Sequence, residues 1–299
     1  MIGILCESME WSDYALCENI AGMGIPAKLF DLEEDGNEDG ILSCSLVVSR
    51  IFASAVFRGH EKSLGRMPGI IEMLRENGIP MINSGAAHFY EISKERSTGA
   101  LAGSGFSVPK VYGVFSPGQT EGAAPIEYPC ILKPDCGGRS NYTKIIRSEE
   151  ELAGFMESAP DIAFLAEEYI CPIYGFLTRV EVIGGSCALI VKRSVVENGL
   201  SAYHLGSEYM RYDDCSSSIK NTAVSAMDLL EIEVGSMDII ENKTGYYIID
   251  VNSVSNVSED NTEMFDFDLM KETAAYIVKR FGCRYNGLGL SRAQAAGRQ

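Results

Sequence analysis

Residues 235–253 read GSMDIIENKTGYYIIDVNS. Two apolar segments flank a polar turn, a pattern that predicts a β-hairpin. Each segment carries an acid, Asp238 or Asp250, where burial of a charge is expensive. If the turn is the three-residue loop 243–245, with its glycine in the left-handed conformation, Asp238 lies opposite Asp250 and Asn252 shares their face. Facing carboxylates repel each other, so the hairpin predicts a bound cation.

The ligands expected for this cation are the oxygens of Asp238, Asp250 and Asn252. Hard oxygen ligands favour Mg²⁺ or Mn²⁺ over zinc. A two-residue turn is the alternative, because it would place the two acids on opposite faces, where water would solvate them. The spacing alone leaves both arrangements open. Since Mg²⁺ usually shares its coordination with substrate phosphates, phosphate ligands are expected elsewhere in the chain.

Residues 131–146, ILKPDCGGRSNYTKII, supply candidate phosphate ligands. Lys133 lies at the end of a predicted strand, and Gly137 and Gly138 follow in a loop whose backbone amides can approach a phosphate. The loop matches neither the Walker A pattern nor the glycine pattern of dinucleotide-binding folds. An ordinary hairpin connection is the alternative interpretation.

The segment AEEYICP, residues 166–172, is a third candidate. A strand that ends at Tyr169 and Ile170, before Pro172, exposes backbone amides and carbonyls that can pair with the edge of adenine. The alternative is a buried strand whose glutamates are solvated.

Composition bounds the class of protein. The chain has 299 residues, 46% of them hydrophobic, which predicts a large core in two or three subdomains. A formal net charge of −17, without a basic cluster, argues against nucleic acid as a partner. The apolar runs are far shorter than the roughly 18 residues that span a bilayer, so no membrane partner is expected. Nine scattered cysteines without a C-x-x-C pair, and no export signal, indicate a reducing cytoplasm.

The order of the predicted elements indicates the architecture. Strand and helix patterns alternate over residues 1–86, which predicts an α/β unit with a parallel sheet. Helical periodicity is expected over residues 86–104, 216–233 and 264–281, and strands and hairpins between them predict α+β parts.

Taken in order, these motifs resemble the ATP-grasp carboxylate–amine ligases, especially the branch of ribosomal-protein glutamylating ligases and related amino-acid ligases. The most specific part is an acid followed twelve residues later by acid-x-Asn, here Asp238, Asp250 and Asn252. The likeness covers nearly the whole chain from residue 80 to the last helix. It implies an N-terminal α/β pre-ATP-grasp subdomain and two α+β lobes that hold ATP between them. The expected limits are residues 1–86, 87–170 and 171–299.

The resemblance also implies roles for individual residues. Two lysines contact the nucleotide, the glycine loop closes over its phosphates, and the hinge segment binds adenine. The residues implied to bind ATP are Lys94, Lys133, Gly137, Gly138, Glu167, Glu168, Tyr169 and Ile170. The acids and the asparagine of the hairpin would hold the Mg²⁺ that bridges the ATP phosphates.

The implied reaction is attack of a carboxylate on the γ-phosphate of ATP, followed by amine attack on the acyl phosphate. Arg193 is the first candidate for the arginine that steadies the acyl oxyanion, and Arg179 is the second; both could instead be structural ion-pair residues. The implied substrates are an amino acid such as glutamate, or another small carboxylate, and an amine-bearing small molecule or peptide. A homo-oligomer is also implied.

Two departures from the family pattern keep an alternative open. No acidic ribose ligand occurs in residues 174–177, and NSVSNVSED, residues 252–260, replaces a Ser-Pro-Gly-like loop. Ser236 also replaces the arginine of D-alanine–D-alanine ligases, which argues against that specificity. The alternatives are a kinase-like enzyme that forms no amide, and a nucleotide-binding regulatory protein of the same fold without ligase activity. Retention of all three metal ligands and both lysines favours the ligase.

Overall fold

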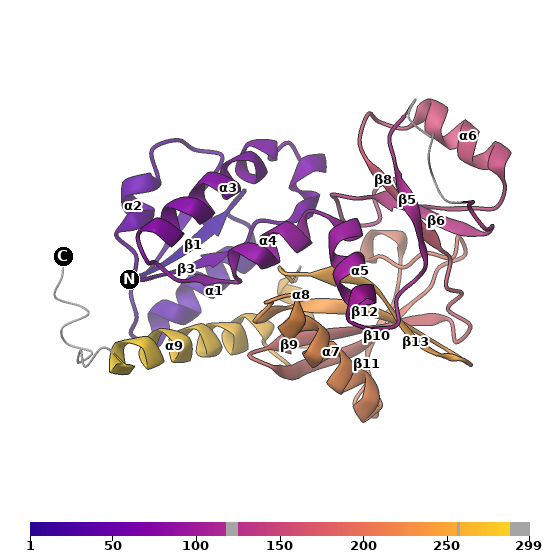
Figure 1. Cartoon of the computed structure of the whole chain (residues 1–299). Coiled ribbons are helices and arrows are strands. Elements are labelled where there is room, and N and C mark those ends of the chain that lie inside the picture. The colour runs from indigo at the N-terminus through magenta and orange to yellow at the C-terminus, as the bar shows by residue number, and fades with distance from the viewer. Residues whose placement is uncertain (118–124, 256–257, 288–299) are drawn as a thin grey trace.

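The structure is a computed structural model that describes residues 1–117, 125–255 and 258–287, with side chains as far as residue 283. Three β-sheets organise the chain, and they follow one another along the sequence (Figure 1). Within the described ranges, no helix combines the length and the apolar character needed to cross a membrane.

The first sheet is parallel, with the strand order β2-β1-β3-β4. Every residue of β1 is buried, as expected for an apolar strand covered by helices on both faces. The strands are β1 (Ile2–Cys6), β2 (Ala27–Asp31), β3 (Leu46–Ser49) and β4 (Met81–Ile82). The helices are α1 (Trp11–Gly22), α2 (Glu38–Leu42), the short 3-10 helix η1 (Ala53–Phe57) and α3 (Glu61–Glu76). The predicted α/β fold class of this part is confirmed.

The second sheet is antiparallel, with the order β5-β8-β6-β7. Its strands are β5 (Val111–Phe115), β6 (Cys130–Pro134), β7 (Lys144–Ile146) and β8 (Phe164–Glu168). Helix α6 (Glu149–Ser158) begins after Ser148, whose hydroxyl caps it by accepting a hydrogen bond from the Glu151 amide at 3.2 Å.

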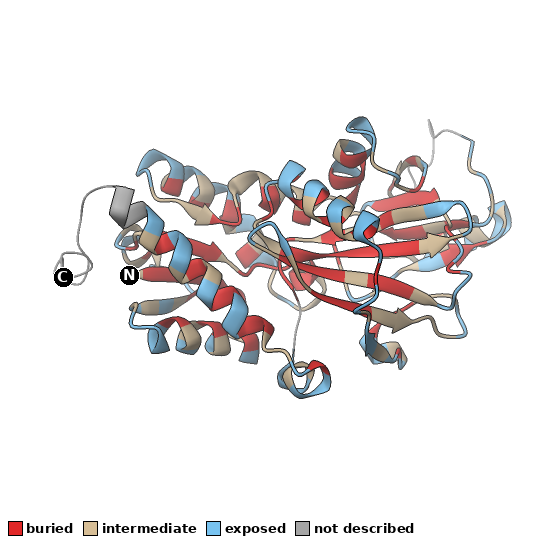
Figure 2. Cartoon of the chain, turned by 90° about the horizontal axis from the view of Figure 1, so that it is seen from below, coloured by how far each residue is buried: buried red, intermediate tan, exposed pale blue. Residues whose placement is uncertain are grey.

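The third sheet is also antiparallel, with the order β11-β10-β9-β12-β13. Its strands are β9 (Phe176–Ile183), β10 (Ser186–Ser194), β11 (Tyr209–Arg211), β12 (Val234–Asn242) and β13 (Gly245–Asn252). The short 3-10 helix η2 (Tyr203–Leu205) and helices α7 (Ser217–Leu229) and α8 (Glu259–Phe265) belong to the same part of the chain. One buried core lies between α7 and this sheet. The strands are largely buried, whereas the helices carry both buried and exposed residues (Figure 2).

The helical pattern expected over residues 86–104 is confirmed, and the structure divides it into two helices. They are α4 (Gly85–Glu91) and α5 (Lys94–Gly103). Ser93 has an extended backbone, and its hydroxyl accepts a hydrogen bond from the Arg96 amide at 3.2 Å. This serine therefore caps a new helix and places Lys94 in its first turn.

Helices pack across the expected subdomain limits. The closing helix α9 (Leu269–Gly287) packs against α1 and the first sheet through residues such as Ala274 and Ile277. Ala87 and Leu101, on α4 and α5, belong to the core of the third sheet. The subdomain limits 1–86, 87–170 and 171–299 therefore stay a prediction. Each of the three ranges contains one sheet, whereas helices pack from one range onto the sheet of another (Figure 1).

Candidate active site

The turn of the β12–β13 hairpin has two residues, which is the alternative that the sequence left open beside the three-residue loop 243–245. Asn242 pairs with Gly245 across the turn. The Asn242 side chain accepts hydrogen bonds from the backbone amides of Thr244 at 2.9 Å and Gly245 at 3.1 Å. This local bond explains the shorter turn, because asparagine can satisfy the backbone two residues on.

A β-bulge nevertheless brings Asp238 opposite Asp250. Ile239 pairs with Ile248, whereas Asp238 pairs with Asp250, so Ile249 is the extra residue of β13. Without the bulge, the two-residue turn would have put the acids on opposite faces. The predicted pairing is therefore correct, but the bulge produces it and not the turn.

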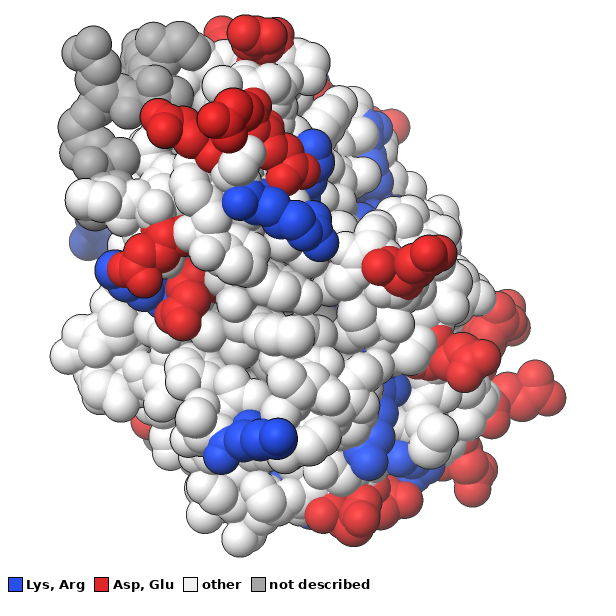
Figure 3. All heavy atoms as spheres, turned by 90° about the vertical axis from the view of Figure 1, so that its right-hand side faces the viewer, with Lys and Arg blue, Asp and Glu red and all other residues white. Residues whose placement is uncertain are grey.

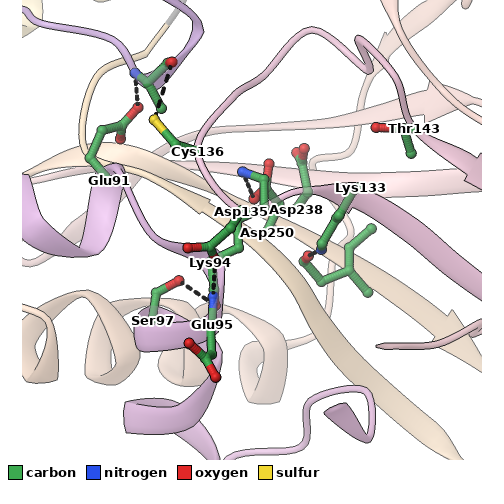
Figure 4. Close-up of polar contacts among 12 residues, drawn as sticks. Glu91, Lys94, Glu95, Ser97, Lys133, Asp135, Cys136, Thr143, Asp238 and Asp250 are labelled. Atoms are coloured by element: carbon green, nitrogen blue, oxygen red, sulfur yellow. Dashed lines mark hydrogen bonds and ion pairs between the residues drawn. The ribbon is translucent and has the colours of Figure 1, made fainter. Parts of the chain in front are cut away.

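Three cations contact the two facing carboxylates. Figure 4 shows one of these contacts, that of Lys94 with Asp250. Lys94 Nζ lies 3.0 Å from Asp250 Oδ1. Arg193 Nη2 and Arg179 Nη1 lie 3.0 and 3.3 Å from the two oxygens of Asp238. Burial would raise the pKa of Asp250, but the nearby lysines outweigh it and hold that pKa below its usual value. These ion pairs offset the repulsion expected from the sequence.

Lys133 reaches the same hairpin from the second sheet. Its Nζ lies 2.5 Å from Glu167 Oε1 and donates a hydrogen bond to the carbonyl of the bulge residue Ile249 at 2.8 Å. Burial raises the pKa of Glu167 in spite of the lysine beside it. The other oxygen of Glu167 is buried and has no hydrogen-bond partner among the described residues. A ligand that donates a hydrogen bond, as the amino group of adenine does, would satisfy this oxygen.

The structure brings all eight residues proposed to bind nucleotide to one cavity between the second and third sheets. We call it the lysine cavity. Its wall contains Lys94, Lys133, Gly137, Gly138, Glu167, Glu168, Tyr169 and Ile170. Asp238, Asp250 and Arg193 complete one end of it. A cavity with two buried lysines, a glycine loop and an unpaired acceptor fits ATP.

A second cavity, which we call the arginine cavity, adjoins the first. Its wall contains Arg139, Arg179 and Arg193. Asp238, Asp250 and Asn252 also line it, so the three proposed metal ligands are brought together. The two cavities share the residues Gly137, Gly138, Arg139, Ser140, Arg193, Ser201, Asp238 and Asp250. The phosphate loop and the facing acids therefore lie at the boundary between the cavities.

The donor set at this boundary fits Mg²⁺. Among the described residues, no group of three or more His, Cys, Asp or Glu side chains could hold a metal ion. A cation here would therefore depend on the carboxylates of Asp238 and Asp250, the amide oxygen of Asn252 and oxygens of the nucleotide. An oxygen-only set that relies on phosphate is typical of Mg²⁺.

Sequence reasoning missed Glu181. Its Oε1 lies 2.8 Å from Arg179 Nε, and its Oε2 accepts a hydrogen bond from Ser255 Oγ. Glu181 thus connects the arginine to the loop that follows Asn252. The signal was available, because Glu181 follows Arg179 by two residues and so shares its face of the strand.

Glu91 was missed as well. It is buried on α4 and accepts hydrogen bonds from the Ser253 amide at 2.6 Å and the Ser253 hydroxyl at 3.0 Å. It also accepts one from the Ala53 amide at 3.0 Å. The residue after Asn252 is therefore fixed to the first part of the chain. No local pattern in the sequence shows a contact over 162 positions.

Charges on the face of the molecule shown in Figure 3 stand in small groups of both signs, separated by uncharged atoms. The described residues of this face therefore form no continuous strip of Lys and Arg side chains.

A family model described as the RimK-like ATP-grasp domain matches residues 93–277. Among curated proteins, a D-alanine–D-alanine ligase of Pediococcus pentosaceus is 30% identical over 145 residues, which are 44% of this chain and 40% of that protein. A protein named "Probable alpha-L-glutamate ligase" of Pasteurella multocida is 24% identical over 191 residues, 62% of this chain and 60% of that protein. The chain thus spans only part of the length of the curated relatives it matches.

Solved structures show the same fold. A RimK domain ATP-grasp protein of Sphaerobacter thermophilus has a TM-score of 0.66 and 17% identity, covering 92% of this chain and 98% of the other. The ATP-grasp ligase PsnB, solved with a phosphomimetic variant of a minimal precursor, Mg and ADP, has a TM-score of 0.63 and 15% identity, covering 94% and 98%. The predicted ATP-grasp fold is confirmed, and ATP and Mg²⁺ are the cofactors of ligases with this fold. The chain belongs to the RimK-like ATP-grasp family.

Proposed function

We propose that the protein is an ADP-forming ligase that joins a carboxylate to an amine through an acyl phosphate. The observation that carries this proposal is the boundary between the two cavities, where Asp238, Asp250 and Arg193 line both. ATP in the lysine cavity would direct its terminal phosphate to this boundary. A carboxylate in the arginine cavity would face that phosphate from the other side.

The chemistry needs positioning and neutralisation of charge more than a covalent catalyst. An oxygen of the carboxylate attacks the γ-phosphorus, the bond from the γ-phosphorus to the bridging oxygen breaks, and ADP leaves. The amine nitrogen then attacks the acyl carbon, the bond to phosphate breaks, phosphate leaves with the electron pair, and a proton passes to solvent. Lys94 and Lys133 offset charge on the phosphates, and bound Mg²⁺ would supply further neutralisation.

Arg193 is the first candidate for the residue that steadies the acyl oxyanion, and Arg179 is the second. Both side chains line the arginine cavity and are 12% exposed, so they are largely shielded from water but open to a ligand. Their contacts with Asp238 hold them in place. The two arginines can therefore form structural ion pairs with Asp238 and still contact a substrate in the cavity.

We propose an amino acid such as glutamate as the carboxylate substrate. Three arginines line the arginine cavity together with Glu91, Asp238 and Asp250, and a guanidinium group can bind a carboxylate with two hydrogen bonds. A relative named as a probable alpha-L-glutamate ligase supports the same choice. The amine belongs to a small molecule or a peptide, and PsnB holds a precursor peptide. A cytoplasmic location and assembly as a homo-oligomer are parts of this proposal.

The test is conversion of Mg·ATP to ADP by the purified protein, with pools of carboxylates and amines and mass spectrometry of the products. Hydroxylamine in place of the amine would trap the acyl phosphate as a hydroxamate. ADP that forms only with one carboxylate, and a condensed mass with one amine, would establish the ligase. ATP binding without ADP from any pool would favour a nucleotide-binding regulatory protein.

A further inference from the structure

A third cavity adjoins the arginine cavity on the side of Arg179, and we call it the apolar cavity. Its apolar wall comes from α1, from β10, and from α8 with the segment that follows it. The apolar residues are Trp11, Leu189, Val191, Phe265, Phe267, Leu269 and Met270. Four residues line both this cavity and the arginine cavity: Arg179, Tyr209, Ser258 and Asn261. The apolar cavity thus adjoins the proposed reaction site.

The floor of the apolar cavity is a packed cluster of Leu189, Val191 and Phe265. Trp11, the one tryptophan of the chain, forms part of the wall and is 39% exposed. At the shared edge, the Tyr209 ring lies 6.1 Å from that of Tyr203, which is 62% exposed. Large exposed aromatic side chains around a cavity with an apolar floor are typical of a ligand contact.

The order of the three cavities indicates which substrate reaches the apolar one. The lysine and apolar cavities share no residue, and the arginine cavity lies between them. In the proposed reaction, the carboxylate attacks the phosphate, and the amine then attacks the acyl carbon. The acyl group therefore lies between the nucleotide and the amine, so the amine substrate occupies the end farthest from ATP.

We infer that the amine-bearing substrate carries an aliphatic or aromatic side chain, and that this side chain lies in the apolar cavity. The inference rests on the proposed ligase function and adds the chemical class of the second substrate. The charge of the carboxylate substrate would be held at the arginines, whereas the amine would be selected by the burial of an apolar group beyond Arg179. Loss of one methylene from such a pocket costs about ten-fold or more in kcat/KM.

The first experiment separates the two proposals. Carboxylates are screened with hydroxylamine, which needs no side-chain pocket, and the one that gives a hydroxamate is then paired with glycinamide, leucinamide, phenylalaninamide and lysinamide. A failure to form any hydroxamate contradicts the ligase itself. With the hydroxamate formed, we expect kcat/KM for leucinamide or phenylalaninamide to exceed that for glycinamide by about ten-fold or more. Equal values, or a preference for lysinamide, would overturn the inference about the amine.

The second experiment changes the cavity. Thr262→Phe would fill it from α8, and Trp11→Ala would remove part of its wall. In both variants we expect the ratio of kcat/KM for leucinamide to that for hydroxylamine to fall by about ten-fold. Tyr14→Ala is the matched control, since Tyr14 lies on the same helix, is exposed and does not line the cavity. A wild-type ratio in both cavity variants, or an equal fall in the control, would refute the inference.

Discussion

Replacing Lys133 with methionine should both destabilise the protein and weaken ATP binding. The Lys133 side chain is 9% exposed and that of Glu167 is 2% exposed, so the substitution leaves a buried carboxylate without its cation. Removing one partner of a buried ion pair typically costs about 3–5 kcal/mol in free energy of unfolding. The hydrogen bond from Lys133 to the Ile249 carbonyl is lost as well.

The stability that Lys133→Met loses relative to wild type should increase with pH. The pKa of Glu167 is already raised by burial, and removal of Lys133 raises it further. The folded variant therefore binds a proton more readily than the unfolded chain, whose glutamates titrate near 4.3. The stability of the variant should therefore fall as pH rises from about 4.3 through the raised pKa of Glu167 in the folded state. The loss relative to wild type is then largest near pH 8 and smaller at pH 5.

The assay is urea unfolding followed by circular dichroism at both pH values, without nucleotide. The double variant Lys133→Met, Glu167→Gln is the matched control, since it has no buried charge and should recover most of the lost stability. By calorimetry, both variants should bind ATP at least about ten-fold more weakly, because a charged hydrogen bond to phosphate is absent. Wild-type stability of Lys133→Met would refute the buried-pair reasoning. Wild-type ATP affinity would remove Lys133 from the phosphate site.

Three further substitutions test the site and the core. Asp250→Asn should lower Mg²⁺-dependent turnover by about 100-fold or more while circular dichroism stays unchanged, and wild-type turnover would exclude it as a metal ligand. Arg193→Ala should lower kcat by about 100-fold with near-normal ATP affinity; an effect on ATP affinity alone would assign it to nucleotide binding. Burial lowers the pKa of His88 to about 4, below its value near 6.5 in the unfolded chain. The unfolded wild-type chain therefore gains a proton at this histidine between pH 7 and pH 5, which lowers the stability of wild type by about 2 kcal/mol. The variant His88→Leu should not show this loss. Identical pH dependence in urea unfolding would contradict that burial effect.

Parts of this site could be predicted from the sequence because they depend on local periodicity. The face shared by Asp250 and Asn252 follows from the alternation of a strand, and the capped start of α6 follows from Ser148. The bulge at Ile249 could not be predicted, because it depends on how the strand fits its neighbour. The pairing of Asp238 with Asp250 was expected from a turn one residue longer than the real one and a strand without a bulge. These two errors cancel, because the bulge adds the residue that the turn lacks.

Contacts between distant residues mark the other limit of sequence reasoning. Lys94 lies 156 positions from Asp250, and Lys133 lies 116 positions from the carbonyl it binds. Propensity and spacing carry no information about such distances; the resemblance to a family identified both lysines but not their partners. Glu167 is an example: the resemblance assigned it to the adenine site but did not show that one of its oxygens pairs with Lys133.

The site also shows how a chain with a net charge of −17 can hold a polyanion. Around the boundary between the cavities, three acids already have a cationic partner: Asp250 pairs with Lys94, Glu167 with Lys133, and Asp238 with Arg193. These pairs hold the lysines and arginines at fixed positions before a nucleotide arrives, so less side-chain entropy is lost on binding. In the proposed reaction, phosphate oxygens would replace Asp250 as the partner of Lys94, and Asp250 would then be available to a divalent cation. We therefore expect the affinity for ATP to depend on this local exchange of partners rather than on the overall charge.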